Sequence, residues 1–148
     1  MDDILGPEFS SYEACNEASD GARNCYTIID RGACPGNSYL ANLRNEEEYN
    51  FVLTFYNSSN YITIISKNHH FNLISSDNFK GSFYIDASDV ASEGTWVDRN
   101  GQPVYTTFLA GEPNGGTSEN CLELRSEGLM NDFPCGSDGH PSLCKIDL

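Results

Sequence analysis

The interpretation of this chain depends on residues 111–135, which read GEPNGGTSENCLELRSEGLMNDFPC. Acid and amide side chains gather here shortly before two cysteines, Cys121 and Cys135. They are Glu112, Asn114, Glu119, Asn131 and Asp132. All five side chains carry oxygen donors, and Ca²⁺ in proteins binds about six to eight oxygens. The stretch therefore predicts a Ca²⁺ site on two loops anchored by cysteines.

An alternative explanation is that each of these residues belongs to an ordinary turn, because Asn, Pro and acidic residues are common there. The grouping of five donors between cysteines favours the Ca²⁺ explanation. Pro113 strengthens it, since X–Pro bonds adopt the cis form far more readily than other peptide bonds. A cis Glu112–Pro113 bond would turn the oxygens of Glu112 and Asn114 the same way.

The flanking sequence predicts short strands around one helix. Asn45 is a good N-cap, three acids follow it, and Tyr49, Val52, Leu53 and Tyr56 recur at helical spacing. Asn100-Gly101 predicts a hairpin between residues 96–97 and 104–105. Strand patterns cover residues 26–29, 83–85, 121–124 and 143–146, with weaker ones at 62–65 and 71–74. Residues 106–120 and 125–142 are expected to be long irregular loops, which usually carry function.

Length and composition indicate one globular domain. The chain has 148 residues, of which 39% are hydrophobic. We expect a polar tail over residues 1–14 and a single domain over 15–148. The net charge is −14 and no run of Lys or Arg occurs, which excludes a nucleic-acid partner. No apolar stretch approaches the roughly 20 residues of a membrane span.

Six cysteines in a short chain favour a disulfide framework and a secreted, extracellular protein. Zinc is the competing explanation, but no Cys-x-x-Cys pair occurs. Residues 1–9 lack the basic and apolar regions of a signal peptide, so we expect any signal to have been removed. The Asn57-Ser58-Ser59 sequon is compatible with secretion.

The sequence does not indicate an enzyme. The adjacent His69 and His70 would point to opposite sides of a strand, and His140 is isolated. Neither a Gly-x-Ser-x-Gly nor a His-Glu-x-x-His motif occurs.

Residues 83–148 resemble the long-loop half of a C-type lectin-like domain, with a looser likeness extending back to residue 15. Glu112-Pro113-Asn114 resembles the mannose-type Ca²⁺ motif of this family, and Asn131-Asp132 is similar to its Trp-Asn-Asp motif. Residues 83–87 are similar to its Trp-Ile-Gly core strand. The resemblance implies an α+β C-type lectin fold of the long form, with mixed and antiparallel sheets and one or two short helices. It also implies three disulfides, which are Cys15–Cys25, Cys34–Cys144 and Cys121–Cys135.

The resemblance further implies Ca²⁺-dependent binding of glycans with vicinal equatorial hydroxyls, as in mannose, fucose and N-acetylglucosamine. The five donors would hold the ion. Glu112, Asn114, Glu119 and Asn131 would also bond the sugar hydroxyls, and Phe133 would either rest against the sugar or anchor the loop. A lone shallow site binds weakly, so useful avidity would require several linked domains, for example in a homo-oligomer. The alternative is a lectin-like module that binds a protein or ice, with Ca²⁺ only ordering the loops.

This sequence departs from the family pattern at an auxiliary Ca²⁺ site and in the hydrophobic core. Asp89, Glu93 and Asn120 resemble residues of an auxiliary Ca²⁺ site. However, Gly115 offers no oxygen there and Asn120 replaces an acid, so we expect that site to be weak or absent. Met130 and Phe108 stand where the family has Trp, which requires a repacked core. Eight residues between Cys25 and Cys34 are few for the family's first helix, and residues 58–82 exceed its usual connection.

Overall fold

The computed structural model describes residues 14–29, 33–34, 36–58, 61–65, 71–75, 82–125, 127–136 and 140–148. The strands are β1 (Ala14–Glu17), β2 (Arg23–Ile29), β3 (Tyr39–Leu40), β4 (Tyr61–Ile65), β5 (Phe71–Ser75), β6 (Phe83–Ser88), β7 (Cys121–Leu124), β8 (Met130–Phe133) and β9 (Ser142–Asp147). The helical elements are α1 (Glu46–Ser58) and the 3-10 turn η1 (Gly116–Ser118).

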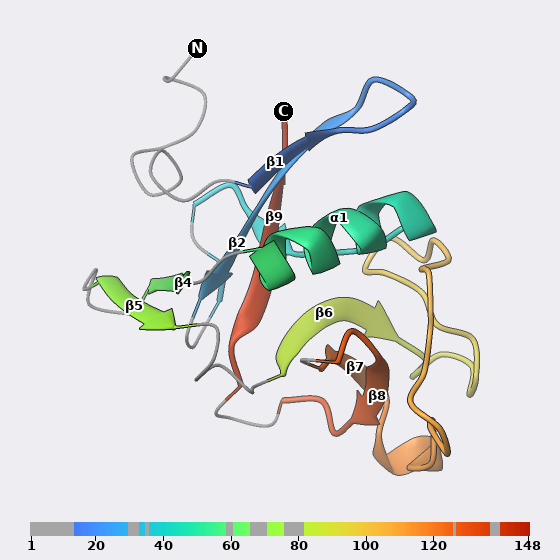
Figure 1. Cartoon of the computed structure of the whole chain (residues 1–148). Coiled ribbons are helices and arrows are strands. Elements are labelled where there is room, and N and C mark those ends of the chain that lie inside the picture. Colours follow the sequence, from blue (N-terminus) through green and yellow to red (C-terminus); the bar gives the residue numbers. More distant parts are fainter. Residues whose placement is uncertain are drawn as a thin grey trace.

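The strands form one mixed sheet in the order β5-β4-β2-β9-β6-β7-β8, with β1 beside β2 and β3 beside β9 (Figure 1). Most neighbours are antiparallel, whereas β2–β4 and β6–β9 are parallel. The expected α+β architecture with a short helix is confirmed. In the described part of the chain α1 is the only α-helix. Cys25 lies within the strand β2.

Helix α1 begins where the sequence predicts. The side chain of Asn45 accepts the backbone N–H of Glu48 over 2.9 Å, which is the bond of an N-cap. Tyr49 and Val52 are buried, with 8% and 1% of their surface exposed. The apolar spacing therefore identified the face of the helix that packs on the core.

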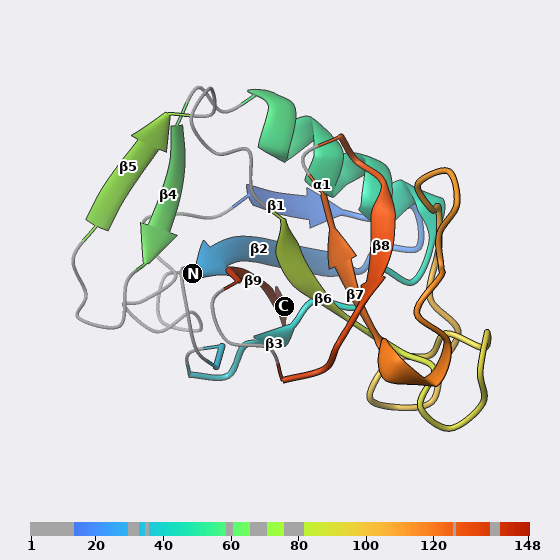
Figure 2. The same ribbon diagram turned by 90° about the horizontal axis from the view of Figure 1, so that it is seen from below.

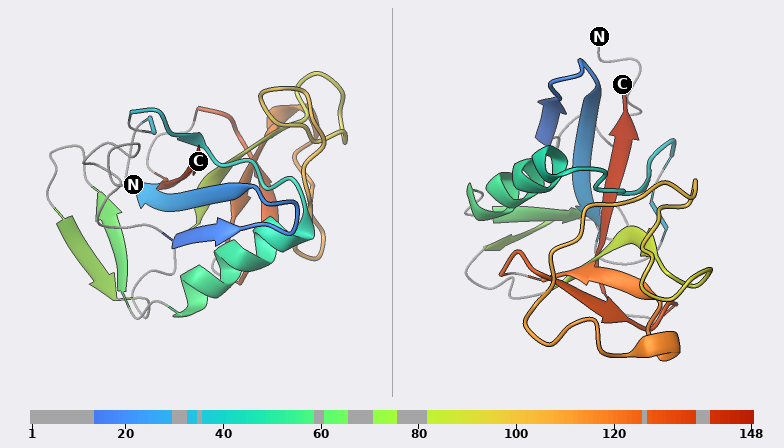
Figure 3. Two further views of the ribbon diagram at one scale, coloured as in Figure 1. Left: turned by 90° about the horizontal axis from the view of Figure 1, so that it is seen from above. Right: turned by 90° about the vertical axis from the view of Figure 1, so that its right-hand side faces the viewer.

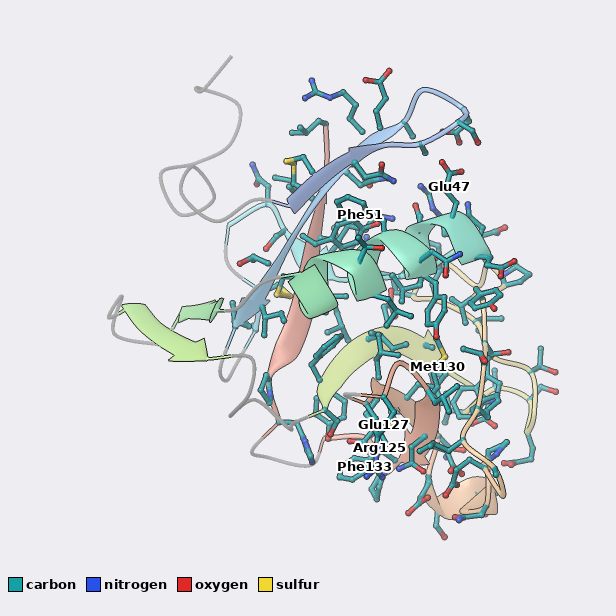
Figure 4. All side chains as sticks on the ribbon, viewed as in Figure 1. Glu47, Phe51, Arg125, Glu127, Met130 and Phe133 are labelled. Carbon is teal, nitrogen blue, oxygen red and sulfur yellow. A yellow bond between two sulfur atoms is a disulfide. The ribbon has the colours of Figure 1, made fainter. Side chains whose placement is uncertain are left out.

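The helix is also attached to the first two strands. Phe51 packs on Tyr26 of β2, with 5.8 Å between the ring centroids. Both carboxylate oxygens of Glu47 accept hydrogen bonds from Ser19, in the loop between β1 and β2, at 2.9 Å. Figure 4 shows Glu47 and Phe51 pointing from α1 toward this pair of strands. These contacts fix α1 on β1 and β2.

The core lies between α1 and the sheet, and β6 supplies one wall of it. Alternate residues of β6 are buried, which is the pattern of a strand with one face on a core. Met130 is fully buried in the same cluster, and Phe108 packs against Trp96 with ring centroids 6.0 Å apart. The core residues are Tyr26, Ile28, Ala41, Leu43, Tyr49, Val52, Phe83, Ile85, Ala87, Trp96, Leu122, Leu124, Met130 and Leu143.

A buried ion pair joins α1 to β9. Glu48 and Lys145 have fully buried side chains, and Lys145 Nζ lies 3.1 Å from Glu48 Oε1. Arg44 donates to the same oxygen over 2.7 Å, and Lys145 also donates to both oxygens of Asn42. Burial opposes ionisation of Glu48, but the bonds from Arg44 and the charge of Lys145 outweigh it and lower its pKa. The sequence treated Glu48 as one of three acids at a helix start, and its partner was not foreseen.

One sequence-based expectation needs correction. Residues 125–142 were expected to be an irregular loop, but β8 forms within them because it pairs with β7 over its whole length. The predicted hairpin around Asn100-Gly101 is confirmed as a short antiparallel reversal, with the bridge Val97–Pro103 and a hydrogen bond from the N–H of Val104 to the carbonyl of Trp96. The carboxylate of Asp98 organises that turn, since it accepts the backbone N–H groups of Asn100 and Gln102.

The weak strand predictions at 62–65 and 71–74 are confirmed as β4 and β5. They pair antiparallel with each other, and β4 extends the sheet by pairing with β2 through Ile28–Ile64 and Ile29–Ile65. Figure 2 shows them at the end of the molecule away from η1. Residues 1–13 of the predicted tail, Ser59 of the sequon and the His69-His70 pair lie outside the described residues.

The three disulfides implied by the family resemblance are confirmed: Cys15–Cys25, Cys34–Cys144 and Cys121–Cys135. The first crosses the β1–β2 pair, and the second ties the segment before β3 to β9. The third joins the start of β7 to the chain just beyond β8, and so braces the strands that carry the predicted ligands. None of the helices in the described ranges is long and apolar enough to cross a membrane.

Candidate metal and ligand site

Glu112 and Asn114 are in contact at the loop that leads into η1. The Glu112–Pro113 peptide bond is cis. Asn114 Nδ2 donates to Glu112 Oε1 over 2.9 Å. The loop lies at one end of the molecule together with η1, as both views of Figure 3 show.

Asp132 fastens this loop to the sheet. Asp132 lies on β8 with 1% of its surface exposed. Each of its two carboxylate oxygens accepts the backbone N–H of Asn114 over 3.1 Å. It also accepts the N–H of Gly115 over 2.7 Å. Hydrogen bonds to an ionised acceptor are roughly twice as strong as those between neutral groups. Asp132 therefore holds the backbone that carries Glu112 and Asn114 against β8.

Glu119 occupies the space beside Gly115. A Cβ atom built on Gly115 would overlap the Cβ, Cγ and Oε2 atoms of Glu119. The backbone of Gly115 has φ −85° and ψ −9°, a conformation that any residue adopts. The requirement for glycine here is steric: only a residue without a side chain leaves room for Glu119. From the sequence, Gly115 was noted merely as a position without an oxygen donor.

The carboxylates of Glu112, Glu119 and Asp132 make this region strongly negative. Burial and the facing carboxylates of Asp132 and Glu119 raise the pKa of Glu112. Glu112 Oε2 is buried and has no hydrogen-bond partner within the described chain. A carboxylate oxygen that is shielded from water without a counter-charge costs free energy, and a bound cation removes that cost. The donors fit a hard cation, although the described residues contain no preassembled group of three or more His, Cys, Asp or Glu side chains at metal-holding distance.

Asn131 and Phe133 are oriented toward a different set of residues. Asn131 Nδ2 donates to Glu123 Oε1 over 3.0 Å. The ring of Phe133 packs edge-on against His140, with 4.7 Å between centroids, and also contacts Tyr84. The structure thus gathers Glu112, Asn114, Glu119 and Asp132 through contacts along one loop and β8, whereas Asn131 and Phe133 have their contacts on the outer face of the sheet.

The predicted auxiliary residues are only partly assembled. Asp89 is 2% exposed; its Oδ2 accepts the N–H of Gly94 over 2.9 Å, and its Oδ1 has no partner among the described residues. The N–H of Asp89 donates to the carbonyl of Asn120 over 3.2 Å, so these two residues adjoin. The amide of Asn120, however, donates to Thr117, and Glu93 is exposed.

Glu123 contacts the predicted ligand Asn131 but is not among the site residues expected from the sequence. It lies on β7 and is 4% exposed. The alternation of Cys121-Leu122-Glu123-Leu124 predicted the strand and placed Glu123 on the same face as Cys121. Its partner could be found only by pairing this strand with residues 130–133, which were expected to form a loop.

Comparisons with known proteins agree with this architecture. The family model for the Lectin C-type domain matches residues 31–146. Echinoidin from Heliocidaris crassispina is 24% identical over 136 residues, which cover 88% of this chain and 82% of echinoidin. Human lithostathine has a similar structure, with a TM-score of 0.64, 19% identity and coverage of 98% of this chain and 92% of that chain. The C-type carbohydrate-recognition domain of cow CD23, solved in the presence of a GlcNAc2Man3 oligosaccharide, gives a TM-score of 0.54 and 22% identity, covering 83% of this chain and 87% of that chain.

Proposed function

Because this chain belongs to the C-type lectin domain family, we propose that it binds carbohydrate through a Ca²⁺ ion held beside Glu112. Members of this family are binding domains and not enzymes, in agreement with the expectation from the sequence. The observation that carries the Ca²⁺ proposal is the convergence of the Glu112, Glu119 and Asp132 carboxylates beside Asn114, where mutual repulsion leaves a place for a cation.

Five residues would hold the ion: Glu112, Asn114, Glu119, Asn131 and Asp132. When bound, Ca²⁺ supplies positive charge and open coordination positions for ligand oxygens. Glu112 and Glu119 accept hydrogen bonds from sugar hydroxyls, while the amides of Asn114 and Asn131 donate to them. Asp132 keeps the loop in place through its two backbone N–H partners, Asn114 and Gly115.

We further propose a sugar of the mannose, fucose or N-acetylglucosamine class. The order of acid and amide in Glu112-Pro113-Asn114 resembles the mannose-type motif, and it sets which hydroxyl donates and which accepts. Of the two roles expected for Phe133, anchoring the loop is the one that its contacts favour, because its ring packs edge-on against Tyr84 and His140.

The remaining features concern the setting of the domain. Three disulfides support an extracellular location, where such bonds persist. A second ion beside Asp89 and Asn120 would bind more weakly than the first, because Glu93 is exposed and Gly115 contributes no side-chain oxygen. Residues 15–148 form the binding domain, and glycan avidity comes from several linked copies.

The proposal is tested by combining calorimetry with glycan binding. Wild-type protein should bind Ca²⁺ with an affinity on the order of 10⁻⁴–10⁻³ M. It should bind immobilised mannose but not galactose, and chelator should abolish the binding. Glu112→Gln should lose both Ca²⁺ and mannose. The matched control is Glu127→Gln, which makes the same change at an exposed residue paired with Arg125 at the β7–β8 turn (Figure 4). Chelator-resistant sugar binding, or a Glu112→Gln protein that binds like wild type, would refute the proposal.

A further inference from the structure

Glu123 and Asn131 face each other across two neighbouring strands. They are directly opposed in the antiparallel β7–β8 pair, so their side chains leave the same face of the sheet. Asn131 Nδ2 donates to Glu123 Oε1 over 3.0 Å. Glu123 lies two residues beyond Cys121, and Asn131 directly precedes Asp132 along β8.

Glu123 is itself held in place. Its other oxygen, Oε2, accepts the hydroxyl of Ser82 over 2.6 Å, and His140 Nδ1 lies 3.9 Å from the same atom. The hydroxyl of Ser82 also lies 3.3 Å from His140 Nδ1. With 4% of the residue exposed, Glu123 makes these bonds away from bulk water, where a hydrogen bond is electrostatically stronger. The carboxylate therefore offers Asn131 a fixed acceptor.

A carboxylate and an amide can meet in only one way. An ionised carboxylate accepts hydrogen bonds and cannot donate them, whereas an Asn amide has a donating nitrogen and an accepting oxygen. The nitrogen of Asn131 must therefore face Glu123. Since the amide group is planar, its carbonyl oxygen is directed away from Glu123.

From this arrangement we infer that Glu123 is a positioning residue of the lectin site, which fixes the Asn131 amide so that its carbonyl oxygen is presented to the ion. The inference rests on the proposed function. Glutamine at position 123 would keep the size and the strand but remove the restriction. It carries both a donor and an acceptor, so Asn131 can bond it in either orientation, and one of them turns the carbonyl oxygen toward position 123.

The test compares Glu123→Gln, Asn131→Ala and the double variant, with Glu127→Gln as the exposed control on the same strand pair. Calorimetry gives the Ca²⁺ affinity of each protein. Thermal unfolding without Ca²⁺ gives its stability. We expect Glu123→Gln to weaken Ca²⁺ binding by about tenfold, the low end of the loss typical for residues that orient a ligand. Asn131→Ala should weaken it at least as much, and Glu127→Gln should not change it. In the Asn131→Ala background, Glu123→Gln should cause no further loss.

The outcomes separate this inference from the proposed function. Wild-type protein that binds no Ca²⁺ would overturn both. If wild type binds Ca²⁺ and Glu123→Gln matches it, only the positioning role fails. A Glu123→Gln protein with a lower melting temperature but unchanged Ca²⁺ affinity would assign Glu123 to stability alone. An equal loss with and without Asn131 would likewise overturn the inference, because Glu123 would then act through another residue.

Discussion

At the scale of single residues, Gly115 controls the position of Glu119. We predict that Gly115→Ala weakens Ca²⁺ binding by about tenfold, because the new Cβ displaces the Glu119 side chain that now fills its place. The backbone at this position suits alanine, but the new Cβ overlaps Glu119 close to its backbone, so stability without Ca²⁺ should fall by about 1 kcal/mol.

Calorimetry and chemical unfolding of the same protein test this pair of effects. In a Glu119→Gly background the Gly115→Ala change should have no further effect on Ca²⁺ affinity, because no side chain is then left at position 119 to displace. Undiminished Ca²⁺ affinity in the single variant would show that Glu119 is not held by Gly115.

The sequence indicated candidate site residues but not the contacts that surround them. Donor chemistry and proximity to Cys121 and Cys135 indicated which side chains to consider, because the sequence alone shows which side chains carry oxygen and which cysteines lie near them. The partner of Asn131 and the steric role of Gly115 depend on which strands and turns lie together. Tertiary packing determines these contacts, and a single sequence does not reveal which elements pack together.

At the scale of elements, α1 was predictable because its start, its acids and its apolar spacing all agree. Strand β8 was not, since two of its four residues, Asn131 and Asp132, have low strand propensity. Strand β8 forms nevertheless, because its pairing with β7 over its full length outweighs the low strand propensity of these two residues. The paired disulfides came from the family resemblance, because six cysteines alone allow about 15 pairings.

The cap of α1 gives a prediction at this scale. Asn45→Ala should lower the free energy of unfolding by about 1 kcal/mol, because the N–H of Glu48 loses the side-chain acceptor that Asn45 provides. Urea unfolding measures the change. Asn45→Asp, which keeps an accepting oxygen, should recover most of the stability. If the alanine variant is as stable as wild type, the cap does not contribute.

At the scale of the whole molecule, the Glu48–Lys145 pair joins α1 to the centre of the sheet and should make stability sensitive to acid. Glu48 has a lowered pKa in the folded protein, so its stabilisation is fully present above its ordinary pKa of 4.5 and is lost as the pH falls through the lowered value. Glu48→Gln should be less stable than wild type at pH 7 by on the order of 3 kcal/mol, because Lys145 then lies buried without its counter-charge.

The same pair of proteins tests the acid dependence. Unfolding in urea at a series of pH values should show the gap between wild type and Glu48→Gln narrowing below about pH 4.5, as wild-type Glu48 gains a proton. A gap of constant size down to strongly acidic pH would mean that the ionised form of Glu48 is not the source of the stability.

The arrangement of β1, β2 and β9 has a consequence for how such domains are displayed. Asn16 of β1 and Asp147 of β9 both pair with Asn24 of β2, so the described chain enters and leaves on one side of the molecule. The loop with η1 lies at the opposite end (Figure 1). A tether attached at either end would leave that loop pointing outward. Copies anchored side by side would present their sites in a common plane, and a glycan-coated surface meeting that plane would be bound at many points, each held at millimolar effective concentration by its neighbours.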